Sequence, residues 1–391
     1  MKSRERVLNA INHEESDRIP IDNNGFVSGI HMVAYEKLLK MLNMKDEIIV
    51  LDPVQKLALM KDEVRDLLGI DTKYIYAKAG LNYEYKTNDD GTFEDEFGAV
   101  FKNCGYYADN IKPPLRGKSL EEVKSYKFPE PKDPTRFEGI EDECKKLCEN
   151  TDYSLWGGNI QSVFYLGWVL RGMEDFMADI CADPKLSSFL IDKICDWVME
   201  WYEGYMNKIG QFIDVFWIAD DWGTQGGPLL SPEYFRKEIV PRFKKIISFI
   251  KTKTKAKCCY HSCGSVYWCL EDFIEMGVDI LHPLQANAQN NDTEKIKKEF
   301  GERLSFHGGT NNQGIFHKDI HSLSIDTLKR IKELGPGGGY IFSSGHNIQA
   351  NVPYENILRL FEICREFGNY PLDINKIDSE IERETELLKK F

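Results

Sequence analysis

From about residue 150 onward, short apolar runs alternate with longer segments whose apolar residues recur at helical spacing. This alternation is typical of βα units built around a parallel sheet. Helical segments are predicted at residues 173–206 and 231–252, where Ser231 before Pro232 marks a helix start. The apolar runs, each ending in polar or glycine residues, are at 153–159, 214–223, 255–264, 278–285, 303–309 and 338–347.

Two further strands are expected within residues 17–25 and 74–80. They bring the expected total to eight, which favours an α/β fold of the closed (β/α)₈ TIM-barrel type over a doubly wound sheet. Since 391 residues exceed the usual size of one domain unless the chain forms such a barrel, we expect a single domain over residues 1–391.

Residues 1–110 are expected to be partly an N-terminal extension of the barrel. Its first 75 residues should be mostly helical, and the acidic, aromatic stretch 82–110 should form an antiparallel hairpin beside the barrel. Residues 372–391 should form a charged terminal helix.

Charge and hydropathy limit the classes of partner. The net charge is −13, with basic residues scattered among acids, so we expect no nucleic-acid partner and a small-molecule substrate or a protein partner instead. No apolar run reaches the roughly 20 residues of a membrane span, and the N-terminus lacks an apolar signal core. We therefore expect a soluble, cytoplasmic protein whose ten cysteines are reduced thiols.

Polar residues at the ends of the expected strands are the candidates for chemistry, because the carboxyl ends of barrel strands face one another across the mouth. Together they would form one polar ring. Its members are Asp22, Asn23, Asn159, Gln161, Asp220, Asp221, His261, Cys263, Gln285, His307, His346 and Asn347.

The spacing His-x-Cys at His261 and Cys263 places an imidazole and a thiol on the same side of an extended segment. Imidazole with thiolate is a zinc-type pair, and the further ligands would come from other strands, with His346, Gln285 and Asp221 as candidates. A two-residue motif also arises by chance, in which case the site is ordinary core. The nearby Cys258, Cys259 and Cys269 are expected to be buried as small apolar residues.

The adjacent carboxylates Asp220 and Asp221 follow an apolar run. Neighbouring residues on a strand point to opposite sides, so one carboxylate should face the mouth while the other caps the next turn or helix. The sequence favours Asp221 as the group that faces the mouth.

Several long blocks, in the right order, give the chain a resemblance to the uroporphyrinogen decarboxylase superfamily over nearly its full length. They are RERVLNAINHEESDRIPID, FYLGWVLRGMEDFMADICADPKL, IADDWGTQGGPLLSPEYFRKEIVPRFKKII, YHSCG, VDILHPLQ and GGYIFSSGHNIQANVPYENI. The resemblance implies a (β/α)₈ barrel. It also implies one of two chemistries: cofactor-free decarboxylation in haem synthesis, or zinc-dependent methyl transfer to or from a corrinoid protein.

In the decarboxylase branch, the resemblance implies an arginine-rich motif just after the first strand to hold a substrate with eight carboxylates. Here residues 19–37 contain no arginine. A mouth lined by Asp22, Asp220 and Asp221 would also repel a polyanion. Decarboxylation, with Asp22 or Asp221 handling the proton, is therefore the second hypothesis.

In the methyltransferase branch, the resemblance implies zinc held by the His-x-Cys pair, here His261 and Cys263, and by a cysteine after the last strand. That third position is His346 in this chain. A neutral imidazole in place of a thiolate makes the metal a better Lewis acid, which suits a methyl ether or alcohol as donor. The acceptor would be a corrinoid carried by a partner protein.

Within this hypothesis, Asp221 orients a ligand or takes a proton, Asp22 is a further catalytic carboxylate, and Gln285 or Asn347 hydrogen-bonds the donor. Aromatic residues near the strand ends are expected either to line a donor pocket or to be ordinary core. They are Trp156, Phe164, Tyr165, Trp217 and Trp222. A third hypothesis is a barrel that binds a small ligand or a corrinoid protein without catalysis.

Overall fold

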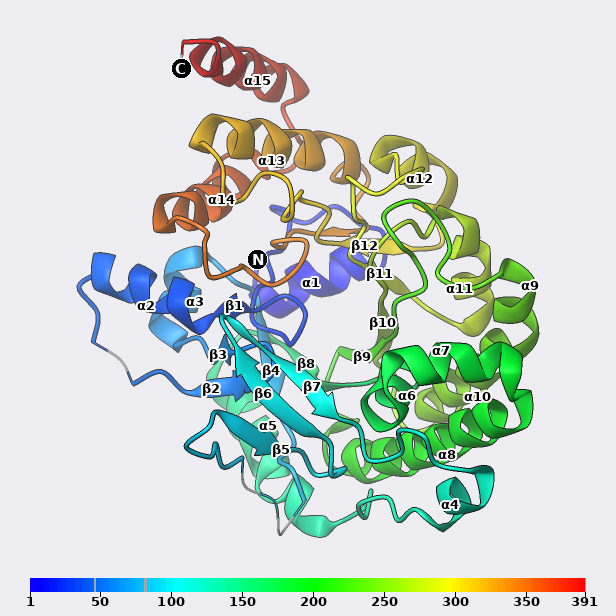
Figure 1. The fold of residues 1–391 in the computed structure, drawn as a ribbon. Coiled ribbons are helices and arrows are strands. Elements are labelled where there is room, and N and C mark those ends of the chain that lie inside the picture. The colour runs from blue at the N-terminus through cyan, green and yellow to red at the C-terminus, as the bar shows by residue number, and fades with distance from the viewer. Residues whose placement is uncertain (46, 81–82, 84, 391) are drawn as a thin grey trace.

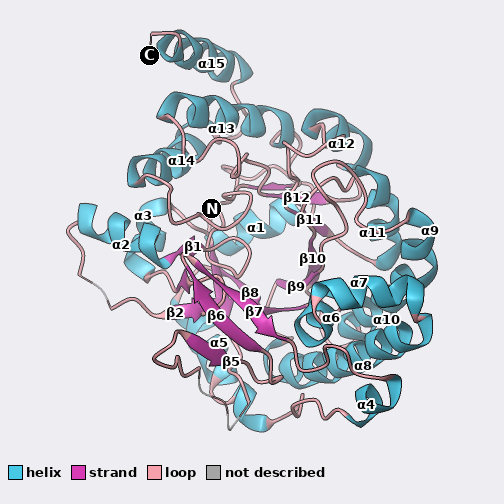
Figure 2. Ribbon diagram, in the orientation of Figure 1, coloured by secondary structure: helices cyan, strands magenta, loops and turns pink. Residues whose placement is uncertain are grey.

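A curled, all-parallel sheet lies at the centre of the molecule, with helices around it (Figures 1 and 2). The computed structural model describes residues 1–45, 47–80, 83 and 85–390. Seven strands are hydrogen-bonded in the order β13-β12-β11-β10-β9-β8-β4. They are β4 (Thr72–Ile75), β8 (Ser154–Gln161), β9 (Val215–Ala219), β10 (Lys257–His261), β11 (Ile280–His282), β12 (Ser305–His307) and β13 (Tyr340–Ile341).

The segment at residues 20–22 joins the two edges of this sheet. Ile21 forms a parallel bridge with Phe342, just after β13, and its carbonyl accepts the N–H of Asp71, just before β4. The strand expected within residues 17–25 is thus reduced to isolated bridges, of which the one at Ile21 pairs beside the sheet. Pro20 has no N–H, so it cannot donate a further rung to β13. The architecture is that of the (β/α)₈ barrel, with a very short first strand.

Helices surround the sheet and carry the chain from one parallel strand to the next. The segment expected to be helical over 173–206 is broken at Asp183, which caps the helix that begins with Pro184. The helices are α1 (Ser3–Ile11), α2 (Met32–Met41), α3 (Asp62–Leu68), α4 (Leu120–Ser125), α5 (Ile140–Asn150), α6 (Phe164–Arg171), α7 (Met173–Ala182), α8 (Pro184–Ile209), α9 (Pro232–Tyr234), α10 (Val240–Lys251), α11 (Leu270–Met276), α12 (Thr293–Phe300), α13 (Ile320–Leu334), α14 (Tyr354–Phe367) and α15 (Ile374–Leu388).

Two small antiparallel sheets precede the main part of the barrel. The first 75 residues are less helical than expected, because β1, β3 and β2 lie among α1, α2 and α3. The hairpin expected at 82–110 is a three-stranded sheet in the described residues, and residues 82 and 84 of that range lie outside them. These strands are β1 (Ile30–His31), β2 (Val50–Asp52), β3 (Leu57–Ala58), β5 (Thr92–Glu94), β6 (Val100–Cys104) and β7 (Tyr107–Lys112).

Helix α1 closes the end of the barrel at which the strands begin. The backbone of Arg4 donates to the carbonyl of Asp152 before β8, and the carbonyl of Ala10 accepts from Gly339 before β13. Val7, Ala10 and Ile11 pack with Trp156 and Trp217 in the barrel interior. The opposite end, where the strands finish, is therefore the one that can hold a site.

The predicted charged terminal helix is α15, which packs against α13 at the edge of the molecule (Figure 1). Residue 391 lies outside the described part. None of the helices in the described residues is both long and apolar enough to cross a membrane.

Candidate metal centre

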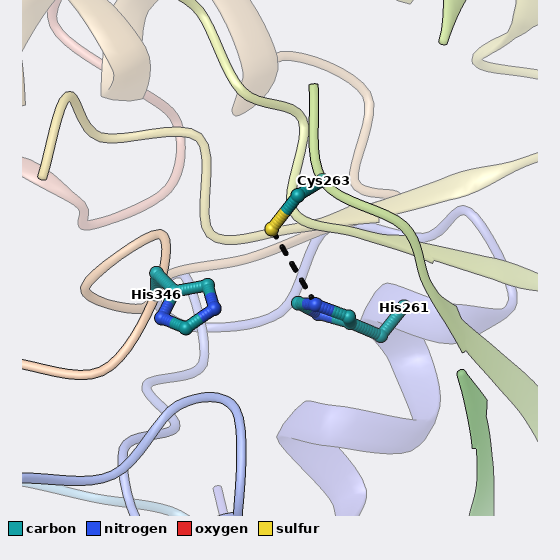
Figure 3. Close-up of side chains that lie close together, drawn as sticks. All are labelled: His261, Cys263 and His346. Carbon is teal, nitrogen blue, oxygen red and sulfur yellow. Dashed lines mark hydrogen bonds between the residues drawn. The ribbon is translucent and has the colours of Figure 1, made fainter. Parts of the chain in front are cut away.

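His261, Cys263 and His346 converge at the carboxyl end of the barrel (Figure 3). One nitrogen or sulfur atom from each lies within 4.8 Å of the others. His261 is the last residue of β10, and the Sγ of Cys263, two residues later, is 3.5 Å from the His261 Nε2. His346 comes from the loop after β13, and its ring centroid lies 5.4 Å from that of His261.

Asp221 joins this group from the loop after β9. Its Oδ1 accepts the Cys263 N–H at 2.7 Å and lies 3.6 Å from the His261 Nε2. Asp220, in contrast, turns away and accepts three backbone N–H groups, from Val163, Phe164 and Tyr165, at the start of α6. The structure thus gives the two neighbouring carboxylates different surroundings: a helix start for Asp220 and the metal-type cluster for Asp221.

The surroundings favour the uncharged forms of the three ligand-type side chains. Burial lowers the pKa of His261 to about 3, and burial together with His261 lowers the pKa of His346 to about 4. Burial, and then the Asp221 carboxylate, raise the pKa of the Cys263 thiol well above its usual range. A divalent cation would reverse the preference of the thiol by favouring the thiolate.

A cavity of about 600 Å³ opens next to this cluster. Asp221, His261 and His346 are among the residues that line it. The other walls come from the loop Asp52–Gln55, from residues 95–101 around β5 and β6, and from the start of α6. The first two of these walls were not predictable from strand ends of the barrel, because they come from the N-terminal part of the chain.

Of the five aromatic residues considered for a donor pocket, Phe164 and Tyr165 line this cavity. Trp156, Trp217 and Trp222 are buried in the core instead. The expectation that Cys258, Cys259 and Cys269 are buried is confirmed, because all three have no exposed surface.

Three further predicted site residues, Gln285, Asn347 and Asp22, are bonded to the chain itself. The Gln285 Oε1 accepts the Gly264 N–H, and the Asn347 Oδ1 accepts the Gly29 N–H. Asp22 is completely buried in the barrel and accepts hydrogen bonds from Thr72, Ser28, Tyr74 and His307. A hydrogen bond from any of these three groups to a ligand would therefore compete with an existing partner, and none of the three lines the cavity.

A residue that the sequence analysis left out is His282, the last residue of β11. It pairs in register with His261, and the two Nδ1 atoms lie 2.8 Å apart. Its position at the end of an apolar run, like that of His261, was the signal in the sequence that could have identified it.

Comparison with known proteins agrees with this architecture. A methyltransferase from Methanosarcina mazei has the same fold, with a TM-score of 0.65 and 18% sequence identity over 94% of this chain and 99% of that one. The uroporphyrinogen decarboxylase of Coxiella burnetii is 25% identical over 168 residues, which are 42% of this chain and 44% of the relative.

The uroporphyrinogen decarboxylase of Sulfurimonas denitrificans is 27% identical over 206 residues, which are 50% of this chain and 54% of the relative. The chain thus spans about half the length of the curated relatives it matches. The family profile described as "Uroporphyrinogen decarboxylase (URO-D)" matches residues 106–367, which is more than half of the sequence. The chain therefore belongs to the uroporphyrinogen decarboxylase (URO-D) family.

Proposed function

We propose that the protein is a methyltransferase in which a zinc ion assists the transfer of a methyl group between a small methylated substrate and a corrinoid protein. One observation carries the proposal: His261, Cys263 and His346 meet beside a cavity that is large enough for a small molecule. Two imidazoles and a thiolate are typical zinc ligands, and three protein ligands leave a coordination position open.

The residues present fit a zinc ion, with one local change. His261 fits as it stands, because its Nδ1 bonds to His282 and its Nε2 faces Cys263. The His346 Nδ1 accepts the Asn347 N–H at 2.8 Å, so a neutral ring carries its proton on Nε2. To act as a ligand through Nε2, His346 must shift that proton to Nδ1 and release the Asn347 N–H.

When bound, zinc would supply Lewis acidity to the oxygen of a methyl ether or alcohol. The chain itself would orient the donor. Phe164 and Tyr165 would pack against its apolar part, and Asp221, which lines the cavity, would hold or take the proton of a donor hydroxyl. The Cys263 N–H fixes the Asp221 carboxylate for this role.

The corrinoid that accepts the methyl group has to approach it through the cavity. The barrel interior is filled by side chains such as Trp156 and Trp217, so a corrinoid cannot enter it. In the transfer, the carbon–oxygen bond breaks with its electron pair staying on oxygen. A reduced cobalt(I) corrinoid supplies the pair for the new bond to methyl.

Decarboxylation of a porphyrinogen is the second candidate, which the curated relatives favour. The cavity argues against it. Among the described residues that line the cavity, Arg136 is the one arginine, and its guanidinium is already paired with Glu96. Asp52, Asp95 and Asp221 line the same cavity and would repel a substrate with many carboxylates.

The test is methyl transfer with free cob(I)alamin as the acceptor and methanol or methoxybenzene as the donor, followed by the absorbance of methylcobalamin. We expect transfer by the zinc-loaded protein and a loss of at least about 100-fold in the Asp221→Ala variant with unchanged thermal stability. Formation of coproporphyrinogen from uroporphyrinogen, without methyl transfer, would instead establish the decarboxylase.

A further inference from the structure

Three further buried side chains form a row with His261 at the carboxyl end of the barrel. His282 ends β11, His307 ends β12, and Asp22 follows the bridge that closes the barrel. His282, His307 and Asp22 have no exposed surface at all. The His261 Nδ1 is 2.8 Å from the His282 Nδ1, and the His307 Nε2 is 2.9 Å from the Asp22 Oδ2.

The middle of this row contains two polar atoms without a partner. The His282 Nε2 and the His307 Nδ1 are buried and make no hydrogen bond within the described part of the chain. The two rings pack with centroids 4.7 Å apart. A buried polar atom without a hydrogen-bond partner lowers the stability of the folded protein by about 1–3 kcal/mol. Two such atoms side by side in a barrel therefore need an explanation.

Asp22 gives the row a direction. An ionised carboxylate only accepts hydrogen bonds, and its neighbours Ser28, Tyr74 and His307 are all able to donate. The His307 Nε2 therefore donates to Asp22, which fixes that end of the row. At the other end, the Nδ1 atoms of His261 and His282 share one hydrogen bond, and only a His282 Nδ1 that accepts leaves the His261 Nε2 lone pair free for a metal.

We propose that His282, supported by His307 and Asp22, is a positioning residue that holds His261 in the tautomer whose Nε2 lone pair faces Cys263 and the metal. This inference rests on the proposed metal site. It assigns Asp22 a task different from proton transfer to substrate, since Asp22 does not line the cavity. Partners of this kind, one bond away from a ligand, typically raise metal affinity by about 10–100-fold.

Two replacements of His282 separate a hydrogen bond from mere packing. In His282→Asn the amide oxygen can stand where Nδ1 stood and still accept from His261. In His282→Gln the amide is one atom further out and cannot occupy that position. The control is His31→Gln, which also replaces a buried histidine, one that accepts the Val33 N–H and bonds to the Tyr106 carbonyl away from the metal site.

Zinc dissociation constants would be measured by competition with a chromophoric chelator, with thermal unfolding as the check on folding. We expect His282→Gln to bind zinc about 10–100-fold more weakly than the wild type, and His282→Asn and His31→Gln to stay within about 3-fold. ¹⁵N NMR of the metal-free protein should show the His261 proton on Nδ1.

Equal zinc affinity in the wild type and His282→Gln, or a His261 proton on Nε2 in the metal-free protein, would overturn the inference while leaving the metal site intact. A wild type that binds no zinc would instead refute the proposed function. The two failures are thus distinguishable in one set of titrations.

Discussion

His346 differs from His261 in the nitrogen that the rest of the chain leaves free. The Nδ1 of His261 bonds to a side chain that can accept, whereas the Nδ1 of His346 bonds to a backbone N–H that can only donate. We therefore predict that zinc binding moves the His346 proton from Nε2 to Nδ1 and breaks the bond to the Asn347 N–H.

The measurement is ¹⁵N NMR of the imidazole nitrogens before and after zinc addition, together with hydrogen exchange at the Asn347 amide. Exchange at this amide should become faster on zinc binding, while the Gly29 amide, which bonds to the Asn347 side chain, serves as the internal reference. If the proton stays on Nε2 in the zinc-bound protein, His346 is not a ligand through Nε2 and the prediction is wrong.

Single residues were predictable where a short motif and a strand end coincide. The pair His261 and Cys263 follows from spacing, because side chains two apart on an extended segment share a side. The bonds that occupy Gln285 and Asn347 were not predictable, because their partners Gly264 and Gly29 are distant in sequence and become neighbours only in the folded chain.

At the scale of elements, the loops after β9 and β10 touch at two glycines. A side chain on Gly264, whose φ is +83°, would place Cβ 2.4 Å from the backbone of Gly223. This contact keeps Asp221 within reach of the Cys263 N–H. We predict that Gly264→Ala lowers the free energy of unfolding by about 2–4 kcal/mol and weakens zinc binding.

The control is Gly117→Ala, because Gly117 also has a positive φ, of +69°, but a Cβ there would meet nothing within 4 Å. Gly117→Ala should lower the free energy of unfolding by only about 1 kcal/mol, because alanine is less stable than glycine at a positive φ. Denaturant unfolding compares the two variants, and an equal loss in both would show that the Gly264 to Gly223 contact is not tight.

The small sheet over the cavity predicts a pH effect. Burial raises the pKa of Asp95, between β5 and β6, to about 6, although the Phe97 and Ala99 N–H groups oppose this shift. A raised carboxyl pKa adds stability that is fully present below the ordinary pKa of about 4 and is lost as the pH rises through about 6.

Asp95→Asn keeps an oxygen for both N–H groups and cannot ionise. Its free energy of unfolding, relative to the wild type, should therefore increase between pH 4 and pH 7, by about 1 kcal/mol or more at the upper end. Denaturant unfolding at both pH values measures this difference. A difference that is the same at pH 4 and pH 7 would mean that Asp95 does not titrate in this range.

For the whole molecule, we propose that residues 1–391 fold as one unit in which the N-terminal segment closes the barrel. Asp71, with 1% of its side chain exposed, pairs with Arg6 and Arg18 and accepts the Ile21 N–H. These contacts link α1, the bridging segment and β4. We predict that Asp71→Ala lowers the free energy of unfolding by about 3–5 kcal/mol, because two cations lose a buried partner.

The control is Asp152→Ala, which removes the exposed carboxylate that pairs with Lys2. It should lower the free energy of unfolding by no more than about 0.5 kcal/mol. Calorimetry of both variants also tests whether the chain unfolds as a single unit. One unfolding transition that shifts as a whole in Asp71→Ala is expected, whereas a separate early transition would indicate that the N-terminal segment unfolds independently.

The barrel itself was predictable from the sequence, because each βα unit repeats the same pattern of an apolar run and a helical segment. The extent of the first strand was not predictable from the sequence, because the sheet is closed there by one bridge at Ile21 and by the side chain of Asp71. The cavity wall formed by residues 95–101 was equally hidden, because nothing in that stretch indicates where it packs.

The most direct test of the central claim is the zinc content of protein purified without chelator, measured in the wild type, Cys263→Ala and Cys259→Ala. Cys259 lies on the same strand but is buried away from the ligand cluster. We expect about one zinc per chain in the wild type and Cys259→Ala, and a large loss in Cys263→Ala. Equal and negligible zinc in all three proteins would contradict the metal site and the function proposed from it.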